Sequence, residues 1–517
     1  MHFAFFSSPA FSIEHSDLNQ KPVPASLPSN ASIGGIKQGI DHILNDRCLK
    51  DSKVGIKIVS LDTGEVVYER NSNGLLMPAS NMKLITTAAA LSKLRPDYKF
   101  KTIVAHDGER EGNVINGNLY IKGFGDPKLV TEELLLIVRN MKNLGIKVIS
   151  GDIIADDSFF DSERIGNGWK ADEDSRAYNA KIGALSLNFN TISVFVGSDK
   201  NDGVRPMVIT NPPTNFVEIV NNAVIKKRRV GTTITVNRIE GGRISNGGGA
   251  FPDNSGDSSP KGLIGDKIIV NGEVSAGKKK FYYYRNISNP PLYTATVFRE
   301  FIEKEGISVK GSLKSGIMPE NAEEILSHES VPLSLIVRDL NKMSNNFIAE
   351  QILKTMGAEI KGAPGTAEKG LSVIEEYLED IGIQKGQYRI ADGSGLSKLN
   401  LLTTSQIIKV LEVMYNDFTL QSEYTASLSV MGIDGSLKKR MNGSSLEGMV
   451  RGKTGTLDEV SAISGYAAIP PRPPFKKGGG GDLKGELFAF SIIMNDFRCD
   501  VGKIWNIQNQ IISVLTK

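Results

Sequence analysis

The chain has 517 residues, and at about 150 residues per domain this length indicates about two to four domains. Apolar residues make up 40% of the chain, which is enough to build packed cores and excludes a protein that is disordered throughout. The net charge is only +3, with acids and bases nearly balanced, so we expect neither a nucleic-acid partner nor an anionic membrane surface. No apolar run approaches the length that spans a bilayer, so we expect no integral membrane segment.

Residues 1–34 are expected to be an N-terminal extension or the remnant of a secretory signal. The apolar residues 3–6 are followed by small residues, which resembles the end of a signal peptide, but neither Lys nor Arg precedes them. Residues 22–32 are rich in Pro and Ser, which is typical of a linker.

The two cysteines, Cys48 and Cys499, stand far apart and do not show the spacing of metal ligands. They would pair if their segments met in one domain. With only two cysteines, the sequence favours two unpaired thiols over a disulfide.

Both ends of the chain show helices and paired strands. Residues 36–49 have helical spacing, and residues 54–59 and 66–68 read as two strands joined by a turn. Near the other end, residues 336–353 form an amphipathic helical stretch. Strands are expected at 449–456, 462–469 and 486–494, with a closing amphipathic helix at 501–515 that more plausibly covers the sheet than a membrane.

The middle of the chain, residues 96–329, has a different texture, with short alternating strands, many Gly and Asn turns and few long helices. Gly-rich segments at 241–262 and 470–485 are expected to be exposed connectors. We therefore expect an α+β protein in which residues 35–95 and 330–517 form one discontinuous domain, with an antiparallel sheet flanked by helices. Residues 96–329 are expected to be an inserted, mainly β, two-lobed region of two small domains.

The first chemical motif is Ser80-Asn81-Met82-Lys83. The same S-x-x-K spacing also begins at Ser258, Ser275 and Ser436, but only Ser80 follows a proline break and opens a sustained helix-forming run. This places Ser80 in the first turn of a buried helix, with Lys83 one turn along on the same face. The free N–H groups and positive dipole end of a helix N-terminus favour a developing oxyanion near Ser80. The alternative is an N-cap serine beside a surface lysine.

Two later motifs complete the pattern. Ser344-Asn345-Asn346 is an S-x-N sequence inside a helical stretch, where three polar residues conflict with helix propensity. Lys453-Thr454-Gly455-Thr456 contains the chain's K-T-G sequence, in a strand-like segment whose glycine permits close approach of a ligand backbone.

The order S-x-x-K, S-x-N, K-T-G resembles serine acyl-transferases that recognise penicillin. The long insertion between the first two motifs resembles the low-molecular-mass penicillin-binding D-alanyl-D-alanine carboxypeptidase/endopeptidase family. Its fold implies a penicillin-recognising, transpeptidase-like catalytic domain. Other segments that look like this family are Gly123-Phe124-Gly125-Asp126-Pro127, residues 156–161, Gly168-Trp169 and residues 187–190 in the insertion, and residues 392–397, 432–437 and 464–466 in the catalytic domain.

The resemblance implies a serine DD-peptidase that cleaves the D-Ala-D-Ala bond of peptidoglycan stem peptides. Ser80 would be the nucleophile, and Lys83 the first candidate for its base, although base assignment in this superfamily is disputed. Ser344 and Lys453 would pass a proton to the leaving amine. Neither a metal nor an organic cofactor is needed.

The resemblance also implies the substrate contacts. Asn346 would hold the substrate amide, and Lys453-Thr454-Gly455-Thr456 would meet the terminal carboxylate. The N–H groups of Ser80 and Thr456 would form the oxyanion hole. Asp156 is a candidate contact for the amino group of the peptide's diamino acid, and a plain turn aspartate is the alternative.

Two other functions are compatible with the motifs: a β-lactamase of the same superfamily, and a non-catalytic peptidoglycan-binding module. The long insertion, and the lack of an evident deacylating Glu near the S-x-N motif, favour the peptidase, and the intact Ser80, Lys83 and Lys453 disfavour the module. We therefore expect a DD-carboxypeptidase, with DD-endopeptidase action on cross-links as a related activity. β-Lactam antibiotics are the expected inhibitors, and the expected location is extracytoplasmic, in the periplasm.

Overall fold

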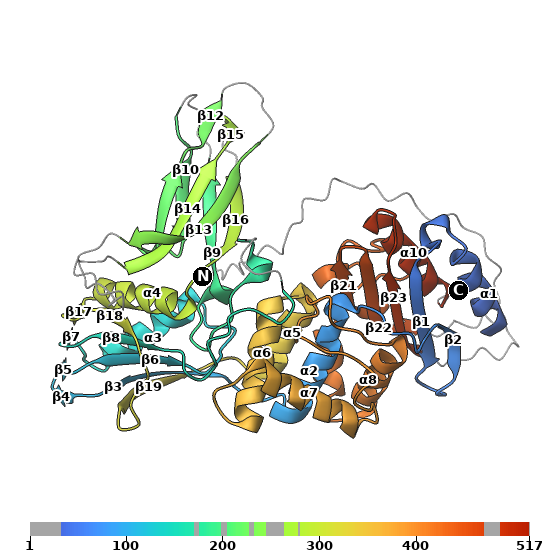
Figure 1. Ribbon diagram of the computed structural model, residues 1–517, viewed down its shortest axis with the longest axis horizontal. Helices are drawn as coiled ribbons and strands as arrows, with labels where there is room; N and C mark the ends of the chain where they lie inside the picture. Colours follow the sequence, from blue (N-terminus) through green and yellow to red (C-terminus); the bar gives the residue numbers. More distant parts are fainter. Residues whose placement is uncertain are drawn as a thin grey trace, which may run out of the picture.

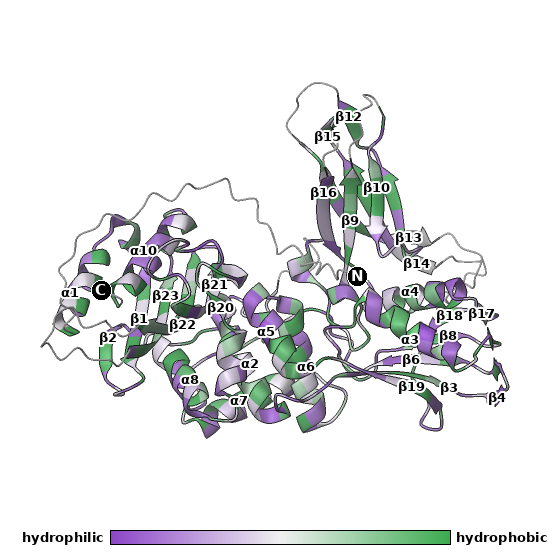
Figure 2. Ribbon diagram, turned by 180° about the vertical axis from the view of Figure 1, so that it is seen from behind, coloured by the Kyte–Doolittle hydropathy of each residue, from purple (hydrophilic) through white to green (hydrophobic). Residues whose placement is uncertain are grey.

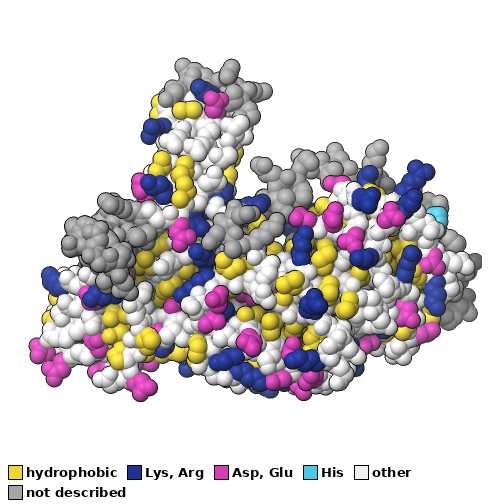
Figure 3. All heavy atoms as spheres, in the orientation of Figure 1, with side chains coloured by type: hydrophobic (Ala, Val, Ile, Leu, Met, Phe, Trp, Pro, Cys, Tyr) yellow, Lys and Arg dark blue, Asp and Glu magenta, His cyan; other side chains and the backbone are white. Residues whose placement is uncertain are grey.

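The computed structural model describes residues 33–169, 175–197, 204–226, 232–244, 263–277, 280–469 and 486–515. The expected extension at 1–34 therefore lies almost wholly outside the described residues, as do the connector at 470–485 and most of the segment at 241–262. Figure 1 shows two parts side by side, one built from both ends of the chain and one built from its middle. Side chains of both charges are interspersed over the face seen in Figure 3.

A six-stranded antiparallel sheet organises the part that contains both chain ends. Its strand order is β2-β1-β23-β22-β21-β20, so the N-terminal hairpin is joined to the C-terminal strands where β1 pairs with β23. This confirms the expected α+β fold. The strands are β1 (Lys53–Ser60), β2 (Val66–Arg70), β20 (Ser429–Val430), β21 (Val450–Leu457), β22 (Val460–Ile469) and β23 (Glu486–Asn495).

Helices cover both faces of this sheet. Because successive side chains of a strand point to opposite sides, one strand contributes to the core on each face. Ile492 of β23 belongs to the core beneath helices α1 (Ile33–Ile43) and α10 (Val501–Val514). The next residue, Ile493, belongs to the core on the other side. That second core is built by α2 (Met82–Leu94), α5 (Leu333–Met343), α6 (Asn346–Lys361), α7 (Ala367–Asp380), α8 (Thr404–Asn416) and α9 (Gln421–Ser427).

Helix α10 therefore covers the sheet, as the sequence indicated. In Figure 2 the helices carry both hydrophobic and hydrophilic residues, as expected for helices with one face on a core. Within the described residues, no helix is long and apolar enough to cross a bilayer.

The expectation of two unpaired thiols is wrong. Cys48 and Cys499 form a disulfide, with their Cα atoms 5.5 Å apart. Cys48 lies in the short 3-10 helix Arg47–Leu49 that follows α1, and Cys499 lies two residues before the start of α10. Because α1 and α10 pack together on one face of the sheet, they bring together two cysteines that are 451 residues apart in sequence.

The helical stretch expected at 336–353 is two helices with a break at the S-x-N motif. Ser344 adopts a left-handed backbone conformation (φ 56°, ψ 39°) and ends α5. Asn345 then caps α6, since its side-chain oxygen accepts the N–H of Ile348 at 3.1 Å. The polar run that conflicted with helix propensity is therefore a helix boundary.

The middle of the chain forms several smaller sheets. A five-stranded sheet of order β18-β8-β6-β3-β19 and a four-stranded sheet of order β17-β7-β5-β4 lie with α3 (Thr131–Asn143) and α4 (Pro290–Lys304). Their strands are β3 (Lys101–His106), β4 (Glu109–Glu111), β5 (Val114–Asn116), β6 (Leu119–Gly123), β7 (Val148–Ile149), β8 (Ile153–Asp156), β17 (Ser308–Val309), β18 (Leu313–Ser315) and β19 (Glu323–Glu329).

Three further sheets project from these strands as an arm (Figure 1). Their orders are β10-β9-β16, β11-β14-β13 and β12-β15. Their strands are β9 (Thr191–Gly197), β10 (Met207–Asn211), β11 (Val217–Asn221), β12 (Val224–Lys226), β13 (Thr235–Ile244), β14 (Leu263–Asn271), β15 (Glu273–Ser275) and β16 (Lys280–Asn286).

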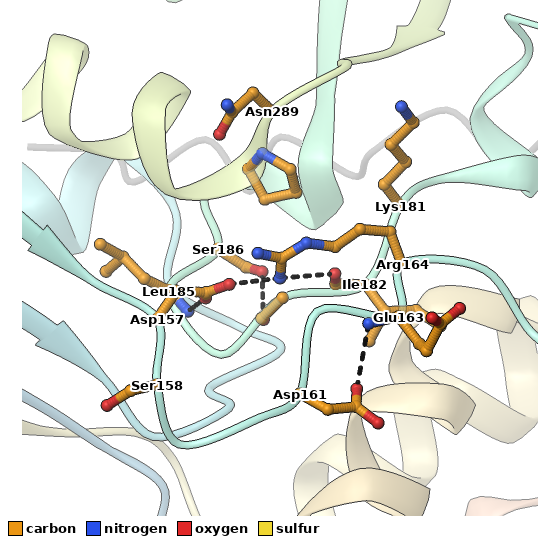
Figure 4. Close-up of polar contacts among 12 residues, drawn as sticks. Asp157, Ser158, Asp161, Glu163, Arg164, Lys181, Ile182, Leu185, Ser186 and Asn289 are labelled. Carbon is orange, nitrogen blue, oxygen red and sulfur yellow. Dashed lines mark hydrogen bonds and ion pairs between the residues drawn. The ribbon is translucent and has the colours of Figure 1, made fainter. Parts of the chain in front are cut away.

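The two parts meet along α6. Within the insertion, Arg164 forms an ion pair with Asp157 and donates to the carbonyl of Ile182 at 3.2 Å, which ties the loop after β8 to the segment before β9 (Figure 4). Gln351 of α6 donates to the carbonyl of Gly183 at 2.8 Å, and Lys354 forms an ion pair with Asp161. The helix that begins at Asn346 is therefore attached to the insertion through buried polar contacts.

Candidate active site

Ser80 lies where the sequence placed it, at the N-terminal end of a buried helix. Ala79, Ser80 and Asn81 form a 3-10 turn, and α2 continues from Met82. The turn is held to the sheet because the side-chain amide of Asn81 donates to Ser464 Oγ of β22 at 2.7 Å. Ala79 has a positive φ of 47°, a conformation that L-residues rarely adopt and that persists only when the surroundings enforce it.

Two glycines pack against this turn and leave no room for a side chain. A Cβ added to Gly455 would lie 2.8 Å from both Ser80 N and Pro78 O. A Cβ added to Gly395, whose φ is 77°, would overlap the carbonyl oxygen of Ala79. The K-T-G glycine therefore lets strand β21 pack directly on the Ser80 turn, whereas the sequence suggested that it made room for a ligand.

Lys83 joins the first two motifs. Its Nζ donates to Ser80 Oγ at 3.0 Å, to Asn346 Oδ1 at 2.7 Å and to the carbonyl oxygen of Ser394 at 2.5 Å. The amide of Asn346 is oriented by its own Nδ2, which donates to the carbonyl of Tyr178 at 3.1 Å. The Lys83 side chain is fully buried.

Burial lowers the pKa of Lys83 to about 7, although the carboxyls of Asp392 and Glu350 favour the charged amine. A substantial fraction of this amine is therefore neutral at neutral pH. Two of its three partners are carbonyl oxygens, which accept hydrogen bonds but cannot donate them. A neutral Lys83 amine has two N–H groups, and when both go to these carbonyls its lone pair faces Ser80.

The second and third motifs meet through Ser344 and Lys453. Lys453 Nζ donates to Ser344 Oγ and to the carbonyl oxygen of Thr454, each at 2.7 Å. Lys453 is fully buried, and this burial, followed by the charge of Lys83, holds its pKa well below the usual value. The left-handed conformation of Ser344 at the end of α5 presents its hydroxyl to this lysine.

The polar positions beyond Lys453 are more accessible. Thr454 is half-buried and Thr456 is exposed, both on β21. Thr454 Oγ1 donates to Ser436 Oγ at 2.7 Å, and Ser436 lies in a 3-10 turn on the loop between β20 and β21. In the sequence Ser436 begins a chance S-x-x-K and lies in the family-like segment 432–437, but its contact with Thr454 could not be predicted, because the pairing of β20 with β21 leaves no local signal.

Comparison with known proteins agrees with this geometry. Residues 36–258 and 261–517 match the sequence profile of the D-Ala-D-Ala carboxypeptidase 3 (S13) family. The chain belongs to this family. A D-alanyl-D-alanine carboxypeptidase of Actinomadura sp. (strain R39) is 33% identical over 482 residues, which cover 90% of this chain and 82% of that protein.

Two further matches come from Haemophilus influenzae, one in sequence and one in structure. A D-alanyl-D-alanine carboxypeptidase DacB is 24% identical over 497 residues, covering 95% of this chain and 90% of that protein. The crystal structure of penicillin-binding protein 4 (dacB) from this organism superposes with a TM-score of 0.73 at 22% identity, covering 91% of this chain and 97% of that one. This likeness supports the penicillin-recognising fold.

One predicted site residue of this S13 chain does not contact Ser80, Lys83 or Asn346. Asp156, at the end of β8, is fully buried and forms an ion pair with Lys122 at 3.2 Å. Its oxygens also accept the N–H groups of Ser158 and Met318, at 2.8 and 2.7 Å. The geometry matches the alternative of a turn aspartate, and the role in substrate binding stays a prediction.

Sequence reasoning missed Glu350, and it identified residues 392–397 as a family-like segment without predicting their contact with the Ser80 helix. Glu350 lies one turn beyond Asn346 on α6, so an acidic residue does stand near the S-x-N motif. Its Oε1 accepts the N–H groups of Gly393 and Ser394 at 3.0 and 2.8 Å. The available signal was a glutamate on the buried side of a helix. Glutamate is seldom buried without a partner, so its position indicates a buried hydrogen-bonding partner nearby.

Proposed function

We propose that this protein is a serine DD-peptidase that hydrolyses the D-Ala-D-Ala bond of peptidoglycan stem peptides through an acyl-enzyme. DD-carboxypeptidase action is the main reaction, and DD-endopeptidase action on cross-links is a second one at the same site. The proposal rests mainly on one observation: the buried amine of Lys83 hydrogen-bonds to both Ser80 and Asn346. Membership in the S13 family supports it.

Acylation begins with the Ser80 hydroxyl. Its oxygen attacks the carbonyl carbon between the two D-alanines, and its proton passes to the neutral amine of Lys83. The C–N bond then breaks, and the leaving amine takes a proton through Ser344, whose hydroxyl already accepts a hydrogen bond from Lys453. Water then attacks the ester carbonyl, the C–O bond to Ser80 breaks, and Ser80 Oγ regains a proton. The proton that Lys83 took up balances the one that the leaving amine received, so both lysines return to their starting states and no cofactor takes part in the proposed steps.

The third motif is proposed to bind the substrate. Lys453, with the hydroxyls of Thr454 and Thr456, suits the terminal carboxylate, because charge-assisted hydrogen bonds to a carboxylate are strong. Asn346 holds the substrate amide, and the N–H groups of Ser80 and Thr456 form the oxyanion hole. Gly455 keeps strand β21 close enough to Ser80 for these groups to act on one carbonyl.

The discriminating experiment uses labelled penicillin, a denaturing gel and a chase. The proposal predicts a covalent adduct that persists through the chase, and release of D-alanine from a peptide that ends in D-Ala-D-Ala. Rapid loss of label would indicate a β-lactamase. Absence of any adduct would indicate a non-catalytic peptidoglycan-binding module.

The proposed partners are peptidoglycan stem peptides, with β-lactam antibiotics as inhibitors. A second crystal structure of the H. influenzae penicillin-binding protein 4, in complex with a β-lactam, superposes on this chain with a TM-score of 0.68. We propose an extracytoplasmic, periplasmic location, because the substrate is found there. The disulfide between Cys48 and Cys499 supports this, since disulfides persist mainly in oxidising compartments.

We further propose that residues 35–95 and 330–517 form the catalytic domain and that 96–329 form the insertion of two small domains. Separate hydrophobic cores support this division. One core draws its buried residues from strands and helices between Val104 and Leu313, whereas the two cores on either side of the six-stranded sheet draw almost all of theirs from outside this range.

A further inference from the structure

A loop outside the three motifs lies directly against α2. The carbonyl oxygen of Ser394 accepts from Lys83, and the carbonyl oxygen of Gly393 accepts from Thr86 Oγ1 at 2.6 Å. Lys83, Thr86 and Ser394 are all fully buried. The path of this loop therefore decides where one of the two carbonyl acceptors of Lys83 lies.

Glu350 holds the loop from helix α6. Its side chain is 1% exposed, and one of its oxygens accepts both N–H groups at residues 393 and 394. This bifurcated contact fixes the peptide unit that precedes the Ser394 carbonyl. Helix α6 also begins with Asn346, so both carbonyl acceptors of Lys83 are anchored to one helix.

The insertion holds the same loop from another direction. Asp392 accepts from Ser397 N at 2.8 Å and from Asn400 Nδ2 at 2.7 Å, which closes the loop on itself. The indole N–H of Trp169 donates to Asp392 Oδ2 at 2.8 Å. The neighbouring Gly168 (φ 78°) packs so closely that an added Cβ would overlap Ser397 Oγ.

We propose that the loop at residues 392–395 is a positioning device for Lys83, held by Glu350 and by Trp169 of the insertion so that the lone pair of the neutral amine faces Ser80. The proposal rests on the DD-peptidase function above. Glu350 and Trp169 act through the loop and are therefore positioning residues. The insertion, through Trp169, therefore helps to orient the amine of Lys83 toward Ser80.

The protonation state of Glu350 sharpens the test. Burial, reinforced by the charge of Asp392, raises the pKa of Glu350 to about 8, so at pH 7 it is mainly the neutral acid. A neutral carboxyl holds the two N–H groups with its carbonyl oxygen, and a glutamine amide offers the same oxygen. The titratable groups around Lys83 are Asp392 and Glu350, whose ionised forms favour the protonated amine, and Lys453, whose charged form opposes that of Lys83.

The central experiment compares two Glu350 variants in acylation by benzylpenicillin at pH 7. Glu350→Gln should stay within about threefold of the wild type because the acceptor is kept. Glu350→Met should lower the acylation rate constant by about a hundredfold, the size expected for a misplaced catalytic group, with little change in the initial binding constant. Glu359→Ala is the control on the same helix, since Glu359 is exposed and contacts Tyr98 OH, and it should match the wild type.

Trp169→Phe tests the same loop if the methionine variant does not fold. It keeps an aromatic ring and removes only the N–H that reaches Asp392, so we expect a loss of about tenfold in the acylation rate constant. Melting temperatures are measured for every variant. A loss of rate at an unchanged melting temperature, restored in Glu350→Gln, distinguishes positioning from general destabilisation.

A second readout does not depend on acylation. In protein labelled with ¹³C at lysine Cε, the Lys83 signal should titrate at lower pH in Glu350→Met than in the wild type, and close to the wild type in Glu350→Gln. Wild-type acylation and wild-type Lys83 titration in both Glu350→Met and Trp169→Phe would overturn the proposal. If wild-type protein is not acylated at all, the DD-peptidase function fails, and the Lys83 titration still decides whether the loop controls this amine.

Discussion

Gly455 of strand β21 lies against the backbone of Ser80, so close that a Cβ on the glycine would be 2.8 Å from Ser80 N. Gly455→Ala should therefore displace the Ser80 turn. We expect the rate constant for acylation by benzylpenicillin to fall by about a hundredfold, because a shift of about 1 Å in a reacting group costs a rate factor of this size. Gly452→Ala on the same strand is the control, because its added Cβ would meet Ser464 O at 3.2 Å rather than the Ser80 turn. Equal acylation of the two variants would show that this contact does not position Ser80.

The pH dependence of acylation should follow Lys83. Only the neutral amine accepts the Ser80 proton, so the second-order rate constant should rise with pH through about 7 and level off above it, in line with the lowered pKa of this lysine. Lys83→Met keeps a similar chain length without an amine and should lose at least about a hundredfold. A rate that keeps rising to pH 10 would mean that Lys83 titrates as an ordinary exposed lysine.

Lys453 is predicted to bind the free carboxylate of the substrate or of benzylpenicillin. Lys453→Met should lower acylation by benzylpenicillin more than acylation by its carboxylate ester, because the charge-assisted contact is worth about 2 kcal/mol or more. Methionine fills most of the same buried space, and the melting temperature serves as the control. A variant that keeps the wild-type preference for the free acid would show that the carboxylate binds elsewhere.

The disulfide should contribute measurable stability. Cys48→Ser and Cys499→Ser should each lower the free energy of unfolding by about 2–4 kcal/mol, because the cross-link restricts the unfolded chain. The double variant should lose no more than either single one, since one bond is broken in all three. Urea unfolding checks this, and additive losses would mean that the two cysteines act independently.

The parts of the site that are local in sequence were predictable. Pro78 and the run of helix formers after Ser80 leave a signal within a few residues, and the structure places Ser80 and Lys83 as this signal indicates. The glycine of K-T-G also indicated a close approach, but in the structure it is the Ser80 turn that lies against it. The polar run at the S-x-N motif also gave a signal, although its physical reason is the left-handed Ser344 that separates two helices.

The parts that the sequence did not reveal depend on contacts between distant segments. The pairing of the cysteines follows from α1 packing with α10, and the place of Ser436 follows from β20 pairing with β21. Lys83 contacts the backbone carbonyl of Ser394, and every residue type has such a carbonyl, so the identity of residue 394 does not indicate this contact. Such contacts become visible only when the tertiary structure is known.

The central claim is that Ser80 is the acylated nucleophile, and peptide mapping by mass spectrometry tests it most directly. The intact protein is incubated with benzylpenicillin, digested, and searched for the added mass of one penicilloyl group. The account predicts that the modified peptide contains Ser80 and that Ser80→Ala abolishes the adduct. Label on a peptide that contains Ser258, Ser275 or Ser436, or an adduct that survives in Ser80→Ala, would contradict it.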